Sequence, residues 1–502
     1  MAETVNPTSP DQPGAQDRAF FGHPRGLATL FMTELWERFS YYGMRALLIL
    51  FMTASTSTGG LGFDVPKAGA IYGLYTAMVY MCSLPGGWLA DRFLGLRRAV
   101  LWGGIVIALG NACLVVHDIR CFYAGLALIV IGTGLLKPNI STIVGQLYRP
   151  GDARRDAGFS IYYMGINLGA FLSPLACGWL GQRVNWHLGF ALASIGMTLG
   201  VIQYLAGGRH LGEAGLRPAA PANPELARRH KRQLQFGLVG IVAVLALLGL
   251  LDWTGAVVIT AQGLSNGLGV LLLVTSVAFF LWLLSMGDWT PAERKRLVVV
   301  GVLFLASSLF WCMFEQAGST LNLFAQRSTR NTVLGFTFPA SWLQSMNALF
   351  IILFAPVFAW LWLKLGKREP SSPAKFAYGL LAGGLGFAVI ALGAVVAQSG
   401  ERVSVMWLVL VYLLHTAGEL CLSPVGLSAM TKLAPARIGG LLMGVWFLST
   451  SVGNYLGGRF ASMYEAWPLP QLFGAVAAFG ILAGLVLALV VKPTVRLMGG
   501  VK

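Results

Sequence analysis

The chain has 502 residues, of which 56% are hydrophobic and only 11% are charged. Soluble domains carry about 25% charged residues, so this composition, with a mean hydropathy of +0.69, excludes an ordinary soluble protein and indicates a chain that mostly faces lipid. The formal net charge of +16 does not indicate a nucleic-acid partner, because the basic residues lie in short loops between apolar runs, as in membrane proteins.

Apolar runs of about 20 residues, the length that crosses a bilayer as a helix, follow one another along the chain. The stretch before them is polar to Ala19 and lacks the apolar core of a signal peptide, so we expect a disordered cytoplasmic tail within 1–27. The runs predict an all-α membrane protein with fourteen spanning helices, at 28–53, 68–91, 98–117, 121–147, 158–182, 188–207, 234–252, 264–286, 296–325, 341–364, 374–398, 405–431, 439–462 and 470–491.

The longest polar stretch, 208–233, divides these helices into two sets. It contains three prolines and a basic run, and we expect a cytoplasmic linker there. The six helices before it form one predicted bundle over 28–207, and the last six form a second over 294–491. The two helices between them, over 234–286, are almost purely aliphatic. We expect an inserted hairpin that packs at the edge and carries no chemistry.

The distribution of Lys and Arg between the loops predicts the orientation in the membrane. With loops assigned alternately from a cytoplasmic N-terminus, the cytoplasmic loops and tails hold 26 of the 36 basic residues and the opposite loops hold 6. We therefore expect both termini, including the tail at 492–502, in the cytoplasm. Four basic residues fall within predicted helices instead: Arg38, Arg45, Lys137 and Arg459.

The first predicted helix carries four charges in an otherwise apolar sequence: Glu34, Glu37, Arg38 and Arg45. Each charge at the bilayer centre costs roughly 2.5–3.5 kcal/mol, so four uncompensated charges would cost about 10 kcal/mol or more. They must therefore face a polar interior and pair, and Glu34 and Arg38 are one helical turn apart. Helical spacing puts the following residues on one face: Glu34, Arg38, Tyr41, Tyr42 and Arg45.

Three more ionisable residues lie deep in other predicted helices: Lys137, Glu315 and Glu419. Such groups mark a substrate or ion path by default, although they can also serve only to hold helices together. His415, one turn before Glu419, is set aside as a core histidine. The candidate pocket is completed by polar and aromatic residues that can equally be interface anchors or helix contacts: Tyr80, Asn167, Trp311, Asn347 and Trp446.

The sequence also lacks the motifs of ATP-driven pumps and common hydrolases. No phosphate-binding loop of the form G-x-x-x-x-G-K-S/T, no H-E-x-x-H and no nucleophile elbow occurs. The six cysteines lie in or beside apolar runs without a C-x-x-C pair, and we expect buried thiols that form neither disulfides nor metal sites. We therefore expect no enzyme activity, no metal and no cofactor.

Several segments resemble known transporter sequences. Residues 86–98, GGWLADRFLGLRR, resemble the cytoplasmic signature of the major facilitator superfamily, with a fainter copy at 366–368. Residues 34–43, ELWERFSYYG, match the E-x-x-E-R-F-x-Y-Y-G motif of the proton-dependent oligopeptide transporter family. Four further segments resemble motifs of this family in the same order: 132–139 around Lys137, 161–169 with Tyr162 in place of a Phe, 314–320 around Glu315, and 418–426 around Glu419.

This resemblance implies a major facilitator fold, in which two six-helix bundles flank a cavity that opens alternately to each side of a bacterial inner membrane. It implies a monomeric symporter that imports di- and tripeptides and is driven by the proton gradient. By the family pattern, Arg38 and Lys137 hold the peptide carboxylate, whereas the amino end is held by Glu419, Asn167 and Asn347. The other implied peptide-binding residues are Tyr41, Tyr42, Tyr80, Trp311, Ser423 and Trp446, and the implied proton-coupling residues are Glu34, Glu37, Arg38, Arg45 and Glu315.

A peptide zwitterion needs basic groups at one end of its site and an acid at the other, and Arg38, Lys137 and Glu419 supply them. One alternative is a proton-coupled carrier of another small solute such as nitrate, which an acid at position 419 disfavours. A transporter-like nutrient sensor is a second alternative, although no sizeable soluble segment is available to relay a signal. We further expect that protonation of Glu315 loosens a pair with Arg45 and lets the halves move.

Overall fold

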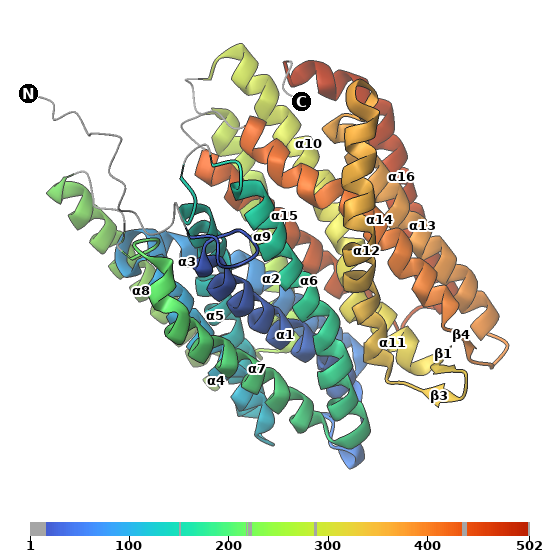
Figure 1. The fold of residues 1–502 in the computed structure, drawn as a ribbon. Coiled ribbons are helices and arrows are strands. Elements are labelled where there is room, and N and C mark those ends of the chain that lie inside the picture. The colour runs from blue at the N-terminus through green and yellow to red at the C-terminus, as the bar shows by residue number, and fades with distance from the viewer. Residues whose placement is uncertain are drawn as a thin grey trace, which may run out of the picture.

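The chain is almost entirely helical, and the computed structural model describes residues 17–149, 152–216, 218, 223–285, 289–433 and 439–499. The first six predicted spans appear as one bundle (Figure 1, blue to green). Its elements are α1 (Arg25–Thr53), the 3-10 turn η1 (Thr56–Thr58), α2 (Val65–Met81), α3 (Ser83–Leu89) with the π-helical turn η2 (Ala90–Leu94), α4 (Leu96–Val115), α5 (Ile119–Gln146), α6 (Arg155–Trp179) with the π-helical turn η3 (Leu180–Val184), and α7 (Trp186–Gly207) with η4 (Gly208–Leu211).

A hairpin (Figure 1, green to yellow-green) and a second bundle (yellow to red) follow. The hairpin is α8 (Pro224–Trp253) and α9 (Ala261–Ser285). The second bundle consists of α10 (Pro291–Phe314), η5 (Glu315–Gly318), α11 (Thr320–Arg327), η6 (Ala340–Gln344), α12 (Ser345–Leu365), η7 (Gly366–Arg368), α13 (Ser372–Ala397), α14 (Met406–Leu433), α15 (Gly439–Ser462) and α16 (Leu469–Leu497). Two small sheets lie in its loops: β1 (Thr329–Arg330) pairs in parallel with β4 (Val403–Ser404), and β2 (Thr332–Val333) pairs in antiparallel with β3 (Phe336–Thr337).

All fourteen predicted spans are confirmed as helical within the described residues, and most begin two to five residues earlier than predicted. The extra residues are polar caps and first turns, which an apolar pattern does not detect. Asp64 accepts a hydrogen bond from the Lys67 backbone N–H (2.8 Å), and Thr290 and Glu293 form a capping box at the start of α10. By length and composition, eleven helices among the described residues can cross a membrane, and the charges in α1 explain why it is not one of them.

Two of the predicted boundary segments differ from the structure. The predicted linker over 208–233 ends at Asn223, because Asn223 caps α8, Pro224 occupies its first turn, and the basic run that follows is helical. Within the predicted disordered tail, residues 1–16 lie outside the described residues, but Asp17 is placed and accepts a hydrogen bond from the Arg25 backbone N–H (2.8 Å). The backbone N–H of Arg25, the first residue of α1, is therefore satisfied by a side chain eight residues earlier.

The inserted hairpin lies at the edge of the molecule, as expected. No residue of α8 is buried, whereas α9 buries one face against α2 and α15. Arg459 of α15, one of the four basic residues within predicted helices, donates a hydrogen bond to Asn266 of α9 (2.7 Å). Of the six thiols, all unpaired, Cys177, Cys312 and Cys421 are buried as predicted, but Cys82, Cys113 and Cys121 are only half-buried.

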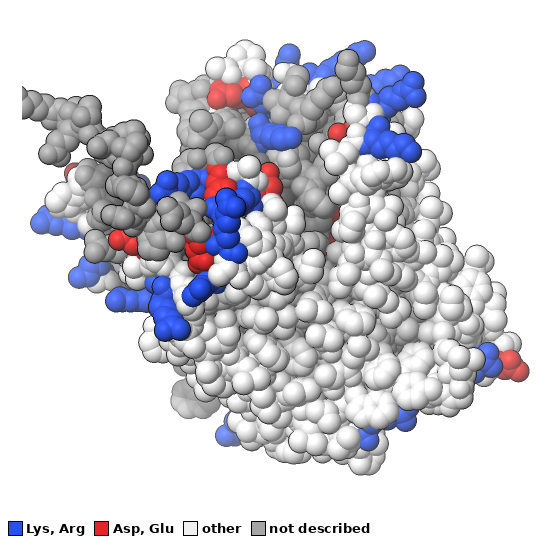
Figure 2. Space-filling model, viewed as in Figure 1, with Lys and Arg blue, Asp and Glu red and all other residues white. Residues whose placement is uncertain are grey.

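The molecule has two different ends. We call the end at which α1 begins and α16 ends the terminal end. We call the opposite end, with the loops at 54–64 and 328–339, the distal end (Figure 1). Basic side chains gather at the terminal end, and a broad belt without charges covers the middle of the molecule (Figure 2). This distribution is that of a protein whose middle faces hydrocarbon.

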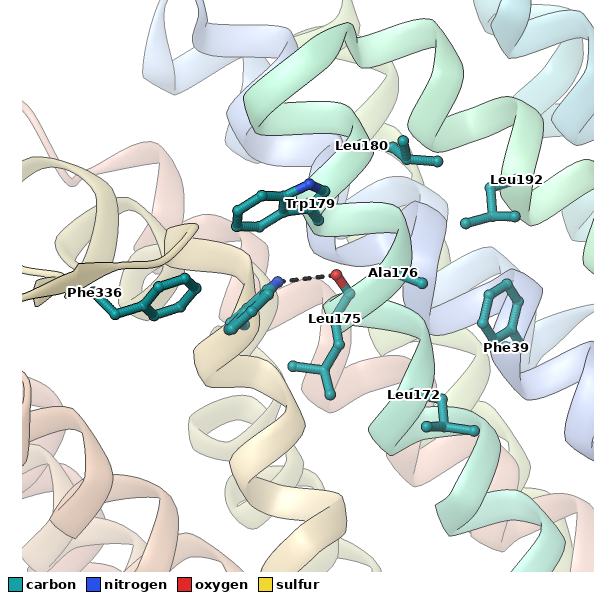
Figure 3. Close-up of a pocket in the computed structure, with 9 residues that line it drawn as sticks. Phe39, Leu172, Leu175, Ala176, Trp179, Leu180, Leu192 and Phe336 are labelled. Atoms are coloured by element: carbon teal, nitrogen blue, oxygen red, sulfur yellow. Dashed lines mark hydrogen bonds between the residues drawn. The ribbon is translucent and has the colours of Figure 1, made fainter. Parts of the chain in front are cut away.

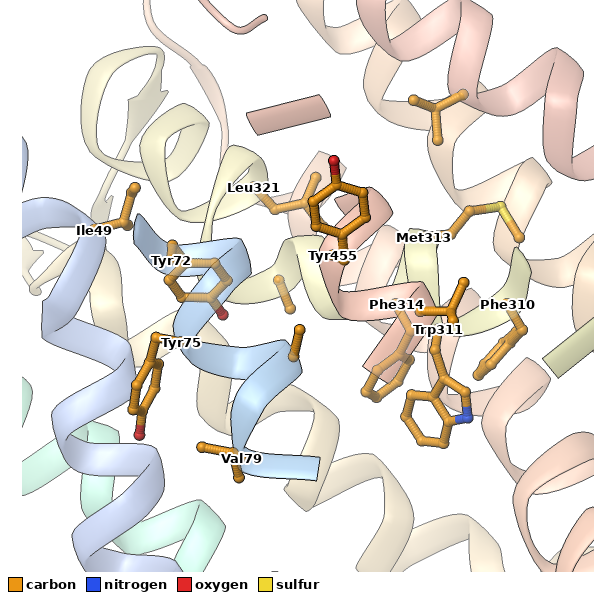
Figure 4. Packing of buried hydrophobic residues seen from close by; sticks show 14 of the residues in the cluster. Ile49, Tyr72, Tyr75, Val79, Phe310, Trp311, Met313, Phe314, Leu321 and Tyr455 are labelled. Atoms are coloured by element: carbon orange, nitrogen blue, oxygen red, sulfur yellow. The ribbon is translucent and has the colours of Figure 1, made fainter. Parts of the chain in front are cut away.

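The two bundles meet in a shared apolar core and are in contact at the distal end. In this core, Tyr72 and Tyr75 of α2 lie near Leu321 and Tyr455 of the second bundle (Figure 4). Contact at the distal end is close: a Cβ at Gly73 of α2 would lie 2.8 Å from the Gly458 Cα of α15. Hydrogen bonds between the bundles reinforce this end, including Trp342 Nε1 to the Leu175 carbonyl (2.9 Å), Ser345 Oγ to the Phe171 carbonyl (2.7 Å) and Asn322 Nδ2 to the Ala46 carbonyl (2.9 Å).

Candidate functional site

A chain of paired charges runs along α1. Glu34, Glu37, Arg38 and Arg45 are all buried, with at most 7% of each residue exposed. The Arg38 Nε lies 2.7 Å from Glu34 Oε1, which confirms the predicted pair one turn apart. It also lies 3.0 Å from Glu37 Oε2, but neither oxygen of Glu37 has a hydrogen-bond partner. Glu37 is therefore held by charge attraction to Arg38 without a directed hydrogen bond.

Tyr162 of α6 completes the surroundings of Glu34. Its hydroxyl donates a hydrogen bond to Glu34 Oε2 (2.7 Å), and its side chain is buried. Glu34 therefore has a donor on each oxygen, one from its own helix and one from α6. The sequence contained a signal for this contact that was not used, because Tyr162 stands where the related motif has a phenylalanine, which has no hydroxyl to donate.

Lys137 of α5 has no acidic ion-pair partner in the described part of the chain. Its Nζ lies 3.6 Å from the centre of the Tyr80 ring, a cation–π contact that links α5 to α2. Among the described residues, its side chain forms no ion pair, in contrast to Arg38 and Arg45. A half-buried ammonium group in this state can accept an anion that arrives from outside the protein.

Arg45 joins the two bundles. Its guanidinium lies 3.0 Å from Glu315 Oε2, which confirms the expected pair between the halves, and its Nε donates to the Tyr72 hydroxyl (2.9 Å). Glu315 begins the 3-10 turn η5 that separates α10 from α11. Gly318 ends this turn, and a Cβ there would meet the Tyr72 hydroxyl and lie 2.8 Å from the Arg45 Nε, so a larger residue would displace the side chains around the pair.

Glu419 of α14 lies on the other side of the site. It is 8% exposed and accepts a hydrogen bond from Asn347 Nδ2 of α12 (2.9 Å), which also donates to Thr416 (3.0 Å). Asn167 does not join this group, because its Nδ2 donates to the Tyr163 carbonyl of its own helix (2.9 Å). Thr416 was not predicted as a site residue, although it lies one turn before Glu419.

The aromatic candidates are spread around these charges. Tyr41 and Tyr42 are in edge contact (centroids 5.2 Å apart), and Tyr42 lies beneath Arg45 (5.5 Å). Trp311 is buried against Phe310 and Phe314, and its Nε1 has no hydrogen-bond partner. Trp446 contacts Phe376 at its edge (6.4 Å), and Ser423 is half-buried one turn beyond Glu419 on α14.

A small cavity connects the groups of the two bundles. It measures about 30 Å³, enough for one or two water molecules, and its lining includes Tyr42, Arg45, Asn347 and His415. His415 was set aside from the sequence, and it lies between the rings of Phe314 and Phe387 (6.3 and 5.4 Å). No group of three His, Cys, Asp or Glu residues in the described part of the chain is placed to hold a metal ion.

The chain is similar over nearly its whole length to known transporters. A family model described as the POT family matches residues 97–476. The chain is 41% identical over 508 residues to the peptide transporter YePEPT of Yersinia enterocolitica, which covers 98% of each protein. It is 39% identical over 494 residues to a di-/tripeptide transporter of Lactococcus lactis subsp. cremoris, covering 97% of this chain and 99% of that one.

A solved structure of a peptide transporter POT in complex with sulfate has a TM-score of 0.92 to this structure at 45% identity, over 96% of this chain and 98% of that one. This likeness confirms the expected fold of two six-helix bundles with an inserted hairpin, and the similarity of sequence extends through every segment on which the resemblance rested. The chain belongs to the POT family.

Proposed function

We propose that this protein is a monomeric, proton-coupled symporter that imports di- and tripeptides by alternating access across a bacterial inner membrane, with both termini in the cytoplasm. The observation that carries the proposal is the arrangement of charge across the two bundles. Arg38 and the unpaired Lys137 lie in the first bundle, and Glu419, held by Asn347, lies in the second. The names of the relatives, a peptide transporter and a di-/tripeptide transporter, support the same class of cargo.

Short peptides share a cationic amino end and an anionic carboxylate, whatever their side chains. Lys137 and Arg38 bind the carboxylate in this proposal, because Lys137 has no acidic partner to displace and Arg38 holds Glu37 without a hydrogen bond. Glu419 and Asn347 bind the amino end, and Asn167 joins them when its side chain leaves the Tyr163 carbonyl. The side-chain walls are formed by Tyr41, Tyr42, Tyr80, Trp311, Ser423 and Trp446.

Proton coupling uses the buried carboxylates that pair with arginines. When a peptide carboxylate binds Arg38, it competes with Glu37 and Glu34, so that these acids exchange protons as the cargo arrives. Glu315 is the third proton-binding group. Its protonation weakens the pair with Arg45, which holds the bundles together (3.0 Å), and allows the distal end to open. Lys137 and Glu419 belong to different bundles, so a peptide bound between them then favours closure of the two bundles around it.

The test is uptake of labelled dialanine into proteoliposomes with acid outside and an inside-negative potential, with and without a protonophore. We expect labelled dialanine to accumulate inside the proteoliposomes. The protonophore should abolish this accumulation, and tripeptides should inhibit it by competition. Glu419→Gln should reduce uptake at least tenfold, since the amino end loses its counter-charge, whereas Glu401→Gln in an exposed loop serves as the matched control. Nitrate uptake without dialanine uptake under the same gradient would refute the peptide proposal.

A further inference from the structure

An apolar groove of about 760 Å³ opens on the surface at the distal end and contains no charged residue (Figure 3). Leu172 and Trp179 in its wall are 40% and 39% exposed, although they lie in a membrane-spanning helix. The groove lies outside the charged site, and none of the charged site residues lines it. Its main walls are Phe39, Leu172, Leu175 and Trp179 of the first bundle and Phe336 and Trp342 of the second.

The dimensions of the groove suit one hydrocarbon chain of one leaflet. On α6 the lining runs from Leu172 to Leu180, which at 1.5 Å per residue is about 12 Å along the helix. Half of the hydrocarbon core of a bilayer is about 15 Å thick. The groove is therefore about as long as one leaflet of hydrocarbon is thick, and its wall includes Trp179 and Trp342, a residue type that is enriched where hydrocarbon meets headgroups.

A cation lies at the mouth of the groove. Arg183, in the turn η3 that continues α6, is exposed, and its guanidinium lies 5.8 Å from the centre of the Trp179 ring. It donates one hydrogen bond, from Nη2 to the Thr337 carbonyl of the second bundle (2.8 Å), which leaves other N–H groups free to bind a phosphate. An apolar groove with a guanidinium at its headgroup end matches the chemistry of a phospholipid.

We propose that this groove binds one phospholipid of the distal leaflet, with an acyl chain between Leu172 and Trp342 and the phosphate at Arg183, and that the bound lipid holds the distal end closed. That the lipid holds the distal end closed follows from the position of the groove walls. They belong to different bundles and are joined by the hydrogen bond from Trp342 to the Leu175 carbonyl. Opening the distal end splits the groove, so its occupant favours the closed state. This inference does not depend on which solute is transported.

The experiment is native mass spectrometry of the purified protein after reconstitution in phosphatidylethanolamine and phosphatidylglycerol and a mild detergent wash. Wild type should retain one lipid. Leu172→Trp and Ala176→Phe fill the groove and should lose it, whereas Leu199→Trp, at a similarly exposed position on α7 outside the groove (42% exposed), should retain it. Arg183→Gln should retain about fivefold less phosphatidylglycerol.

Equal lipid retention by Leu172→Trp, Ala176→Phe and Leu199→Trp would show that the retained lipid is bulk lipid and would refute the proposed binding site. If the filling variants do not fold, Arg183→Gln decides alone, because Arg183 is exposed and the change removes only its hydrogen bond to the Thr337 carbonyl. Unchanged retention by this variant would contradict the proposal. The link to closure is tested by Gly73→Leu, which forces α2 from α15 at the same end of the molecule. That variant should lose the lipid although it leaves the groove residues intact, and full retention would refute the link.

Discussion

The carboxylates nearest the centre of the site are held unequally, which decides what an arriving anion displaces. Glu34 accepts hydrogen bonds from both Arg38 and Tyr162, whereas Glu37 has only its charge contact with Arg38. A hydrogen bond to a charged group contributes roughly 1.5–3 kcal/mol, so Glu37 is the easier of the two to separate from Arg38. The Tyr162 hydroxyl thus distinguishes the surroundings of two acids that lie three residues apart.

Removing the Tyr162 hydroxyl should change the pH dependence of uptake. In Tyr162→Phe, Glu34 loses one of its two hydrogen-bond donors and keeps only the one from Arg38, while Glu37 and Lys137 still lie near it. We expect the pH of half-maximal dialanine uptake to rise by about one unit. Tyr378→Phe, at an exposed position on α13, is the control, and identical pH profiles for the two variants would contradict this role.

At the scale of elements, the distal end is closed by helices in near backbone contact. Gly73 of α2 and Gly458 of α15 leave no space for a side chain, and this pair belongs to opposite bundles. Small residues at such crossings allow the close packing that replaces the hydrophobic effect inside a membrane. The α2–α15 contact and the Arg45–Glu315 pair therefore hold the same end by different means, packing and charge.

Gly73→Leu should destabilise the structure described here. Inserting a large side chain into packed space costs about 1–3 kcal/mol, and we expect the apparent Tm in detergent to fall by about 2–6 °C at a fixed scan rate. Tryptophan fluorescence during heating measures this. Gly237→Leu, on α8 where a Cβ would meet no atom within 4 Å, should leave the Tm unchanged, and an equal fall in both variants would argue against a specific role of the crossing.

At the scale of the whole molecule, the two bundles are linked by an ion pair that a single proton can break. Arg45 and Glu315 are both buried, and they join α1 to the turn between α10 and α11. An inside-negative potential contributes about 2.3 kcal/mol per charge per 100 mV, so each proton carried inward can drive a change in the relative position of the bundles. In the proposed mechanism, this ion pair is the link between proton binding and the movement of the two bundles.

Glu315→Gln should separate exchange from accumulation. Glutamine preserves the size of the side chain but neither binds nor releases a proton, so peptide counterflow should persist while acid-driven accumulation is lost. Both are measured in the same proteoliposomes. Asp152→Asn is the control, because hydrogen bonds from Arg154 lower the pKa of Asp152 to about 2, and the group remains ionised throughout the pH range of transport. Full acid-driven accumulation by Glu315→Gln would contradict the assignment.

The sequence by itself determined the number and places of the apolar helices and the ion pair between Glu34 and Arg38. A bilayer requires about 20 apolar residues for each crossing, so apolar runs of that length identify the helices. The ion pair between Glu34 and Arg38, one turn apart, follows from helical geometry. The Arg45–Glu315 pair was anticipated only through the family resemblance. Polar caps and the helical start of α8 were missed, since they add no apolar signal.

Only the tertiary structure decided which distant polar groups meet. Tyr162 reaches Glu34, and Arg459 reaches Asn266, across separations that no local period encodes. Asn167 and Asn347 were both expected to hold the peptide amino end with Glu419. The Asn167 amide instead donates to a carbonyl of its own helix, whereas the Asn347 amide donates to Glu419. The physical reason is that hydrocarbon offers polar groups no hydrogen-bond partners, so they pair within the protein where they can, and which partner lies within reach depends on how the helices cross.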